Sequence, residues 1–194
     1  TMNALTAKEW IQETISVWRQ RGLGAKHPDT RFERLHPAPY SYTDVARIIR
    51  FFSKPGDTVL DPFLGIGSTL KAAATEGRNG VGIELNKEFA RLSIERLDQE
   101  LDASVLQATS QNILQGDSRA VLQEFDPDSV DLLVTSPPYW NILHKKDQKV
   151  KQEREGKGLA TRYSEDDPLD LGNISDYEAF LDALMDIFRS CQRV

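Results

Sequence analysis

The residues best suited to chemistry follow an apolar run at 130–134 and form a short motif of Ser136, Pro137, Pro138 and Tyr139, here called the proline turn. A strand that runs into two prolines must leave the sheet there, because proline has no N–H to donate and its φ is fixed. The exit holds a hydroxyl, free carbonyls and an aromatic ring, which are the groups needed to bind a flat polar ring. A plain turn that ends a strand, with aromatic rings packed beneath it, would contain the same residues.

A second set of candidate residues forms a glycine-containing loop between a predicted strand and a predicted helix. Residues 58–60 are typical of a short strand, and a helical stretch runs to Gly77. In α/β folds, a glycine loop between a strand and a helix is the layout that places a cofactor at the carboxyl ends of the strands. An ordinary tight turn between strand and helix has the same pattern. The glycine loop consists of Asp61, Pro62, Phe63, Leu64, Gly65, Ile66, Gly67, Ser68 and Thr69.

The glycine loop fits neither of two common nucleotide motifs. A P-loop has a lysine followed by serine or threonine after its last glycine, and no lysine follows Gly67. A dinucleotide fingerprint has a third glycine or an alanine at the position that Leu70 occupies here. Nucleoside triphosphates are therefore disfavoured as ligands, and the dinucleotide signal is weak.

Acidic residues end the next two predicted strands. The second strand ends in Glu84, 19 residues after Gly65, where a carboxylate can accept both hydroxyls of a ribose. Glu84 could instead cap the following helix, a role that Asn86 can also fill. The third strand ends in Asp117 before a short helix at 118–125. Asp117 could accept a hydrogen bond from an exocyclic amine, or it could simply cap that helix.

Hydrophobic periodicity predicts the elements that position these residues. Strands are expected at 58–60, 80–84, 112–117 and 130–135, and helices at 6–20, from 41 or 43 to 52, at 87–101 and from 175 to about 191. Thr6 with Glu9, and Ser175 with Glu178, have the spacing of capping boxes. The face of the second helix that should be buried carries Val45, Ile48, Ile49 and Phe52.

Two polar segments, at 19–36 and 141–167, are expected to be loops, because their apolar residues do not recur at the spacing of a helix or a strand. Between residues 141 and 162 there are seven basic and three acidic residues, which gives a local charge of +4. A loop of this length is often functional. It could close over an anionic backbone, or it could be a solvated surface loop.

Length and composition fit one α/β domain. The 194 residues are enough for one core and too few for two comfortable ones. The net charge of −6 argues against a surface coated for non-specific nucleic-acid binding. The single cysteine, Cys191, excludes an internal disulfide framework and a multi-cysteine metal site. No apolar run reaches the length of a membrane span, and there is no signal-peptide pattern, so we expect a cytoplasmic protein without a metal.

The glycine loop, Glu84 and the proline turn, in this order at strand ends, resemble the amino-group DNA methyltransferases. These enzymes use S-adenosyl-L-methionine to methylate N4 of cytosine or N6 of adenine. The resemblance covers residues 36–140. It implies a Rossmann-like methyltransferase fold with a mainly parallel sheet, in which the four predicted strands take the order 3-2-1-4.

The resemblance assigns most of the cofactor site. The glycine loop would pass under the methionine moiety, with Asp61 or the loop amides near its amino group, and residues 36–40 would pack over it. Glu84 would accept the ribose hydroxyls and Asp117 would meet the adenine amine. The cofactor residues implied are His36, Pro37, Tyr40, Asp61, Pro62, Phe63, Gly65, Gly67, Ser68, Thr69, Glu84, Leu85, Asp117 and Ser118.

The resemblance makes the proline turn the catalytic site. A base in a duplex must be flipped out to expose its amino group, and Tyr139 would stack on it. Hydrogen bonds to the Ser136 hydroxyl and the Pro137 carbonyl would localise the amino lone pair, and Pro138 would complete the turn. Catalysis is then chiefly alignment, without a covalent enzyme intermediate. Serine before Pro137 favours cytosine N4; adenine N6, a base amine in RNA and a non-catalytic cofactor-binding subunit are the alternatives.

The chain departs from the family in two respects. No target-recognition region is inserted before the proline turn, and four strands stand where the family has seven. We therefore expect residues 1–35 to form an N-terminal helix and basic loop, and 36–194 to form a partial catalytic domain. A further segment or a second polypeptide would complete the sheet. DNA is the expected partner, through a recognition region elsewhere or the segment 141–162, in a restriction–modification setting.

Overall fold

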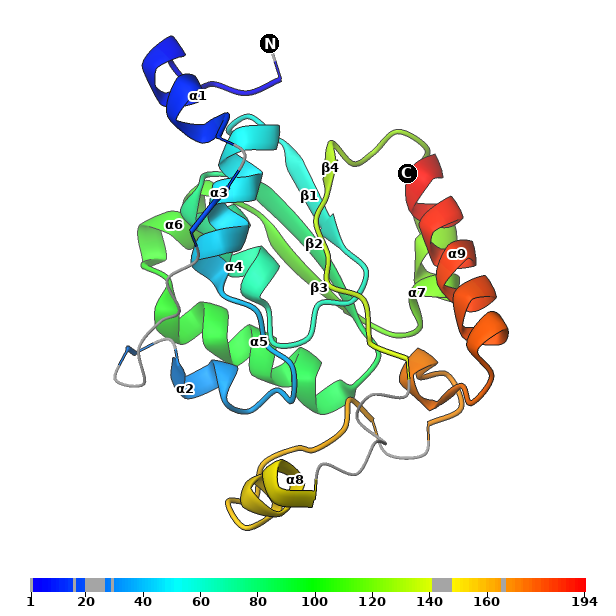
Figure 1. Ribbon diagram of the computed structural model, residues 1–194. Coiled ribbons are helices and arrows are strands. Elements are labelled where there is room, and N and C mark those ends of the chain that lie inside the picture. The colour runs from blue at the N-terminus through cyan, green and yellow to red at the C-terminus, as the bar shows by residue number, and fades with distance from the viewer. Residues whose placement is uncertain (1, 16, 20–26, 29, 141–147, 165–166) are drawn as a thin grey trace.

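The computed structural model describes residues 2–15, 17–19, 27–28, 30–140, 148–164 and 167–194. At its centre lies a parallel sheet with the strand order β3-β2-β1-β4 (Figure 1), which confirms the predicted order. The strands are β1 (Thr58–Asp61), β2 (Asn79–Glu84), β3 (Gln111–Gln115) and β4 (Leu132–Leu133). Because all three pairings are parallel, the carboxyl ends of the strands meet at one edge of the sheet.

β4 is shorter than the strand predicted at 130–135. Only Leu132 and Leu133 pair with β1, opposite Val59 and Leu60. The last hydrogen bond between the two strands runs from the N–H of Val134 to the carbonyl of Leu60 at 3.1 Å. The prolines that follow have no N–H, so the ladder stops at that point.

Helices cover both faces of the sheet (Figure 1), with α3, α4 and α5 on one side and α7 and α9 on the other. The helices are α1 (Ala7–Glu13), α2 (Thr30–Glu33), α3 (Tyr42–Phe52), α4 (Ser68–Thr75), α5 (Lys87–Glu100), α6 (Ala103–Ala108), α7 (Ser118–Val121), α8 (Gln148–Glu155) and α9 (Tyr177–Arg193), with 3-10 turns η1 (Leu122–Glu124) and η2 (Leu171–Asn173). No helix in the described part of the chain has the length and apolar character needed to cross a membrane.

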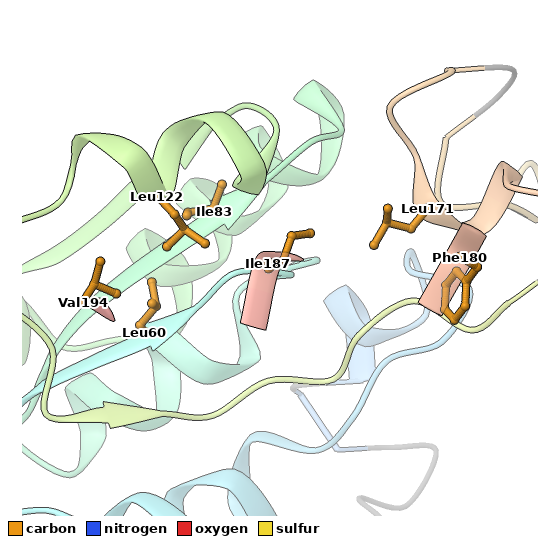
Figure 2. Close-up of a cluster of buried hydrophobic side chains, with 7 residues drawn as sticks. All are labelled: Leu60, Ile83, Leu122, Leu171, Phe180, Ile187 and Val194. Carbon is orange, nitrogen blue, oxygen red and sulfur yellow. The ribbon is translucent and has the colours of Figure 1, made fainter. Parts of the chain in front are cut away.

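Alternate residues of β1 enter two different cores, as a sheet covered on both faces requires. Val59 packs against α3 and α4 through Val45, Ile49 and Ala72. Leu60 points the other way, into the cluster shown in Figure 2. The buried members of that cluster are Leu60, Ile83, Leu122, Leu171, Phe180, Ile187 and Val194.

Several predicted helix boundaries are wrong. The first helix ends at Glu13 instead of residue 20, since Thr14 already forms its C-cap in a stretch rich in β-branched residues. The capping box of Thr6 and Glu9 is confirmed. In α9 the N-cap is Asp176, whose side chain accepts the N–H of Ala179, so the predicted box at residue 175 is wrong.

The segments predicted as loops also contain helices. α2 lies within 19–36, and α8 lies within 141–167, where high charge hid any apolar period. Residues 20–26, 29, 141–147 and 165–166 of these segments lie outside the described residues. In α3, Phe51 is buried and Phe52 is 44% exposed, so the predicted inward position of Phe52 is wrong.

Candidate functional site

A cavity of about 620 Å³ that opens to solvent lies at the carboxyl ends of the strands. Ten residues predicted from the sequence line it: His36, Pro62, Phe63, Gly65, Glu84, Leu85, Asp117, Ser118, Ser136 and Pro138. They come from separate segments of the chain that the parallel sheet brings to one edge. The cavity therefore joins the predicted cofactor residues to two residues of the proline turn.

A smaller cavity of about 270 Å³ adjoins it, between residues 36–40 and the glycine loop. Its walls include Tyr40 and Ser68, and it shares His36 and Ser136 with the larger cavity. The remaining predicted residues, Pro37, Asp61, Gly67, Thr69, Pro137 and Tyr139, line neither of these two cavities.

The glycine loop needs glycine at two positions for steric reasons. Gly65 and Gly67 have φ values of 58° and 81°, in the left-handed region. A Cβ on Gly67 would lie 3.2 Å from the Cβ of Ser93 in α5, and a Cβ on Gly65 would lie 3.3 Å from Nε2 of His36. The loop is thus packed between α5 and residue 36, and Pro62, Phe63 and Gly65 stand in the wall of the large cavity.

Glu84 fastens the end of β2 to the glycine loop. One carboxylate oxygen accepts the N–H of Gly65 at 2.7 Å, and the other accepts the N–H of Asn86 at 2.8 Å. The cap of α5 is Asn86, which accepts the N–H of Glu88 at 2.9 Å, so helix capping is not the role of Glu84. Burial raises the pKa of Glu84 to about 8. When Glu84 is ionised, each of its oxygens keeps a second lone pair for a hydroxyl in the cavity; below about pH 8 the bound proton occupies one of these positions.

Asp117 caps α7, the plainer of its two predicted roles. Its side chain accepts the N–H of Arg119 at 2.9 Å and forms an ion pair with that residue's guanidinium at 2.8 Å. It also lines the cavity, so its predicted contact with an amine stays a prediction. Ser118 donates to the carbonyl of Pro62 at 2.5 Å and joins this helix to the glycine loop.

Asp61 is fully buried behind the cavity. Its carboxylate accepts from the N–H of Phe63 at 3.0 Å, the hydroxyl of Tyr40 at 3.0 Å, the hydroxyl of Thr135 at 2.6 Å and the hydroxyl of Thr69. A carboxylate has about four acceptor positions, and four protein donors point at this one. The predicted contact between Asp61 and the amino group of a cofactor therefore stays a prediction, with the amides of the glycine loop as the alternative neighbours of that group.

His36 is buried against the glycine loop as a neutral imidazole. Its Nδ1 accepts the N–H of Ala38 at 3.2 Å, so the ring proton lies on Nε2. The ring packs edge-to-face on Phe89, with 4.7 Å between the centroids. Burial lowers the pKa of His36 to about 4. The residue thus offers a hydrogen-bond donor beside both cavities without adding charge to them.

The proline turn presents its residues on two sides. Ser136 and Pro138 face the large cavity, whereas Tyr139 is 53% exposed. Tyr139 borders a third, narrow cavity that also includes Arg162 and Tyr163. The predicted stacking of Tyr139 on an extruded base stays a prediction.

A further wall, made by residues 163–164 and 169–171, was not indicated by any sequence pattern. Tyr163 accepts a hydrogen bond on its backbone carbonyl from Asn86 Nδ2 at 2.7 Å, and its ring lies 5.6 Å from that of His36. Burial raises the pKa of its phenol to about 12, and a hydrogen bond from the backbone of Tyr139 opposes that rise. Asp170 holds the wall in place by accepting the hydroxyl of Ser164 at 2.5 Å. Only the length of the segment could have suggested a functional role.

The described part of the chain has no cluster of side chains that could bind a metal ion. Among those residues, no group of three or more histidine, cysteine, aspartate or glutamate side chains is placed to hold a metal ion. The chemistry that the described residues offer is that of backbone amides, hydroxyls, carboxylates and aromatic rings.

Residues 4–95 match the model of the DNA methylase family. Type II methyltransferase M.MthZI of Methanothermobacter thermautotrophicus is 44% identical over 96 residues, 50% of this chain and 26% of that protein. DNA adenine methyltransferase YhdJ of Escherichia coli is 37% identical over 102 residues, 49% of this chain and 33% of that protein. The chain thus spans about a quarter to a third of these relatives. The resemblance inferred from the motifs is confirmed for this half of the chain.

Likeness to solved structures is weaker. TTHA0409 of Thermus thermophilus, crystallised with S-adenosyl-L-methionine, is 30% identical and covers 59% of this chain and 44% of that chain, with a TM-score of 0.36. The assignment to a Rossmann-like α/β fold rests on the parallel sheet and its strand order.

Proposed function

From the match of residues 4–95 to the DNA methylase family, we propose that the chain is part of a DNA methyltransferase that uses S-adenosyl-L-methionine. The reaction transfers a methyl group to the exocyclic amino group of a flipped base, with cytosine N4 as the first candidate. One observation carries the proposal beyond sequence similarity. Ser136 of the proline turn and Glu84 of the predicted cofactor site stand in the walls of the same cavity.

The cavity walls fit the cofactor. Gly65 leaves the loop without a side chain in the cavity wall where the methionine moiety would lie, and Glu84 has acceptor positions for ribose hydroxyls. Leu85 and Phe63 supply apolar surface for an adenine ring. S-adenosyl-L-methionine supplies an electrophilic methyl group on a sulfonium centre. The protein's part is to bind it in one orientation and to exclude water.

The proline turn acts on the other reactant. The protons of the base amino group donate to the Ser136 hydroxyl and the Pro137 carbonyl, which localises the nitrogen lone pair. Tyr139 stacks on the extruded base, and its exposed ring supports this role. No side chain of the turn needs to form a covalent bond, so the rate depends on alignment of the two reactants.

Two bases remain as candidates for the substrate. Serine before Pro137 favours cytosine N4. Adenine N6 is the second candidate, because YhdJ, which matches half of this chain, is a DNA adenine methyltransferase. Digestion of methylated DNA to nucleosides and mass spectrometry separates the two, and recovery of N6-methyladenine alone would reject the cytosine assignment.

The function is tested by transfer of a labelled methyl group from S-adenosyl-L-methionine to duplex DNA and, in parallel, to structured RNA. We expect transfer to DNA, and we expect Tyr139→Ala to abolish it. Phe52→Ala is the matched control, because Phe52 is also a partly exposed ring, at 44%. It lies at the end of α3, which precedes the amino end of β1, whereas the cavity lies at the carboxyl ends of the strands. Labelling of RNA alone, or equal transfer by wild type and Tyr139→Ala, would contradict the proposal.

We also propose that the outer edge of β4 is covered by a further strand of this protein or of a second polypeptide. Within the described residues β4 pairs only with β1, and Leu133 is 37% exposed. Such an edge offers unpaired N–H and C=O groups to another strand. Light scattering of the isolated chain tests this, and a stable monomer with cooperative unfolding and tight cofactor binding would contradict it.

A further inference from the structure

The hydrogen-bond ladder of the sheet does not hold the proline turn in place. The last ladder hydrogen bond of β4 comes from the N–H of Val134, and neither Pro137 nor Pro138 has an N–H to donate. The two prolines make the turn stiff, but stiffness does not fix where the turn lies relative to the glycine loop. Side chains must supply that restraint. The phenol of Tyr163 contacts the backbone of Tyr139 at the end of the turn, and the start of the turn needs a contact of its own.

Thr135, the residue between the strand and the turn, supplies it. Its hydroxyl donates to Oδ1 of Asp61 at 2.6 Å, a bond between residues 74 positions apart in the sequence. The same oxygen accepts the N–H of Phe63 in the glycine loop at 3.0 Å. One carboxylate oxygen therefore holds both the start of the turn and the start of the loop.

The other carboxylate oxygen of Asp61 holds the opposite side of the cofactor site. Oδ2 accepts the hydroxyl of Tyr40 at 3.0 Å and that of Thr69, which is in the first turn of α4. Tyr40 ends the segment predicted to pack over the methionine moiety. Asp61 is 0% exposed, so water does not compete for these bonds. Burial has the largest effect and raises the pKa of Asp61 above its usual value. The hydrogen bonds that its carboxylate accepts from Thr135, Thr69, Phe63 and Tyr40 oppose that rise.

We propose that Asp61 is a positioning residue that, through Thr135, holds the proline turn in line with the cofactor loop. This inference rests on the proposed function. An in-line displacement depends on the relative position of two bound reactants, and a displacement of about 1 Å can cost on the order of 100-fold in rate. Loss of the Thr135 bond should therefore slow methyl transfer and leave cofactor affinity nearly unchanged.

The kinetic test compares three substitutions. Thr135→Val removes the hydroxyl and keeps the shape, and we expect at least about a tenfold loss in the single-turnover rate. The Kd for S-adenosyl-L-methionine, measured by calorimetry, should stay within about twofold. Thr135→Ser keeps a donor and should restore most of the rate. Thr109→Val is the matched control, because it removes a hydroxyl that bonds the carbonyl of Val105 at 3.0 Å, far from the turn.

The proposal is overturned if Thr135→Val transfers methyl groups at the wild-type rate, or if Thr135→Ser is as slow as Thr135→Val. It is also overturned if the rate and the cofactor affinity fall together, since that is the result of a general loss of structure. Should Thr135→Val fail to fold, Thr135→Ala replaces it as the variant that lacks the hydroxyl.

A second measurement does not depend on activity and separates this inference from the proposed function. Trp140 follows the turn directly and packs on Tyr177, with 5.0 Å between ring centroids. With 5-fluorotryptophan incorporated, its fluorine resonance, assigned with Trp140→Phe, reports the position of the turn. We expect the resonance to shift or broaden in Thr135→Val and to return in Thr135→Ser. An unchanged resonance in Thr135→Val overturns the positioning role, even if the wild type transfers no methyl group.

Discussion

The carboxylate of Glu84 accepts the backbone N–H of Gly65 at 2.7 Å and so joins the end of β2 to the glycine loop. Its second oxygen accepts the N–H of Asn86 at 2.8 Å. Burial is the main reason that its pKa rises from 4.5 to about 8, and the charges of Asp61 and Asp170 add to the rise. A group with this pKa links the stability of the cofactor site to pH.

Stability should fall as pH rises from 6.5 through 8. The folded protein holds the Glu84 proton more tightly than the unfolded chain, so this contribution is complete below pH 4.5 and is lost as pH passes about 8. The slope can reach about 1.4 kcal/mol per pH unit. Urea unfolding at several pH values measures it, and Glu84→Gln should lack the decline. An equal decline in that variant would contradict the assignment.

His36 should have the opposite effect in acid. Its pKa falls from 6.5 to about 4 because of burial, so its contribution is present above pH 6.5 and is lost as pH falls through 4. His36→Phe keeps a ring against Phe89 and removes the titration. Its stability relative to wild type should therefore improve as pH falls from 6.5 to 4. A difference that does not vary with pH would show that His36 does not titrate in this range.

Gly67→Ala should reduce the stability of the protein. The added Cβ meets Ser93 at 3.2 Å, and φ is 81°. The left-handed conformation alone costs roughly 1–2 kcal/mol for a residue with a Cβ. Gly77→Ala is a matched control, because Gly77 has φ of 75° and its added Cβ would have no neighbour within 4 Å. We expect a larger loss for Gly67→Ala in thermal unfolding; equal losses would mean that contact with Ser93 is unimportant.

Tyr163→Phe should slow methyl transfer more than it weakens cofactor binding. The variant keeps the ring beside His36 and loses the phenol that the backbone of Tyr139 contacts. Loss of one hydrogen bond of about 1 kcal/mol corresponds to roughly a fivefold change. Transfer rate and calorimetric Kd are the measurements, and Tyr177→Phe removes an exposed phenol as a control. A full rate in Tyr163→Phe would show that the phenol does not hold the turn.

The sequence predicted the sheet well because its strands are short apolar runs that end in turn residues, a local signal. It also predicted most of the cavity wall, since parallel strands bring their carboxyl ends together whatever lies between them. The predicted ends of the helices were less accurate. The end of α1 and the presence of α8 depend on weak local preferences that tertiary contacts override.

By itself, the sequence determined the two glycines of the loop and the carboxylate at the end of β2, because each follows from backbone geometry or short-range spacing. The strand order was implied by the family resemblance. Only the tertiary structure decided the contacts of Asp61 and Tyr163. A hydrogen bond such as that of Thr135 to Asp61 joins residues 74 positions apart, and whether these side chains meet depends on how the whole sheet packs. No periodicity or motif in the chain predicts that contact.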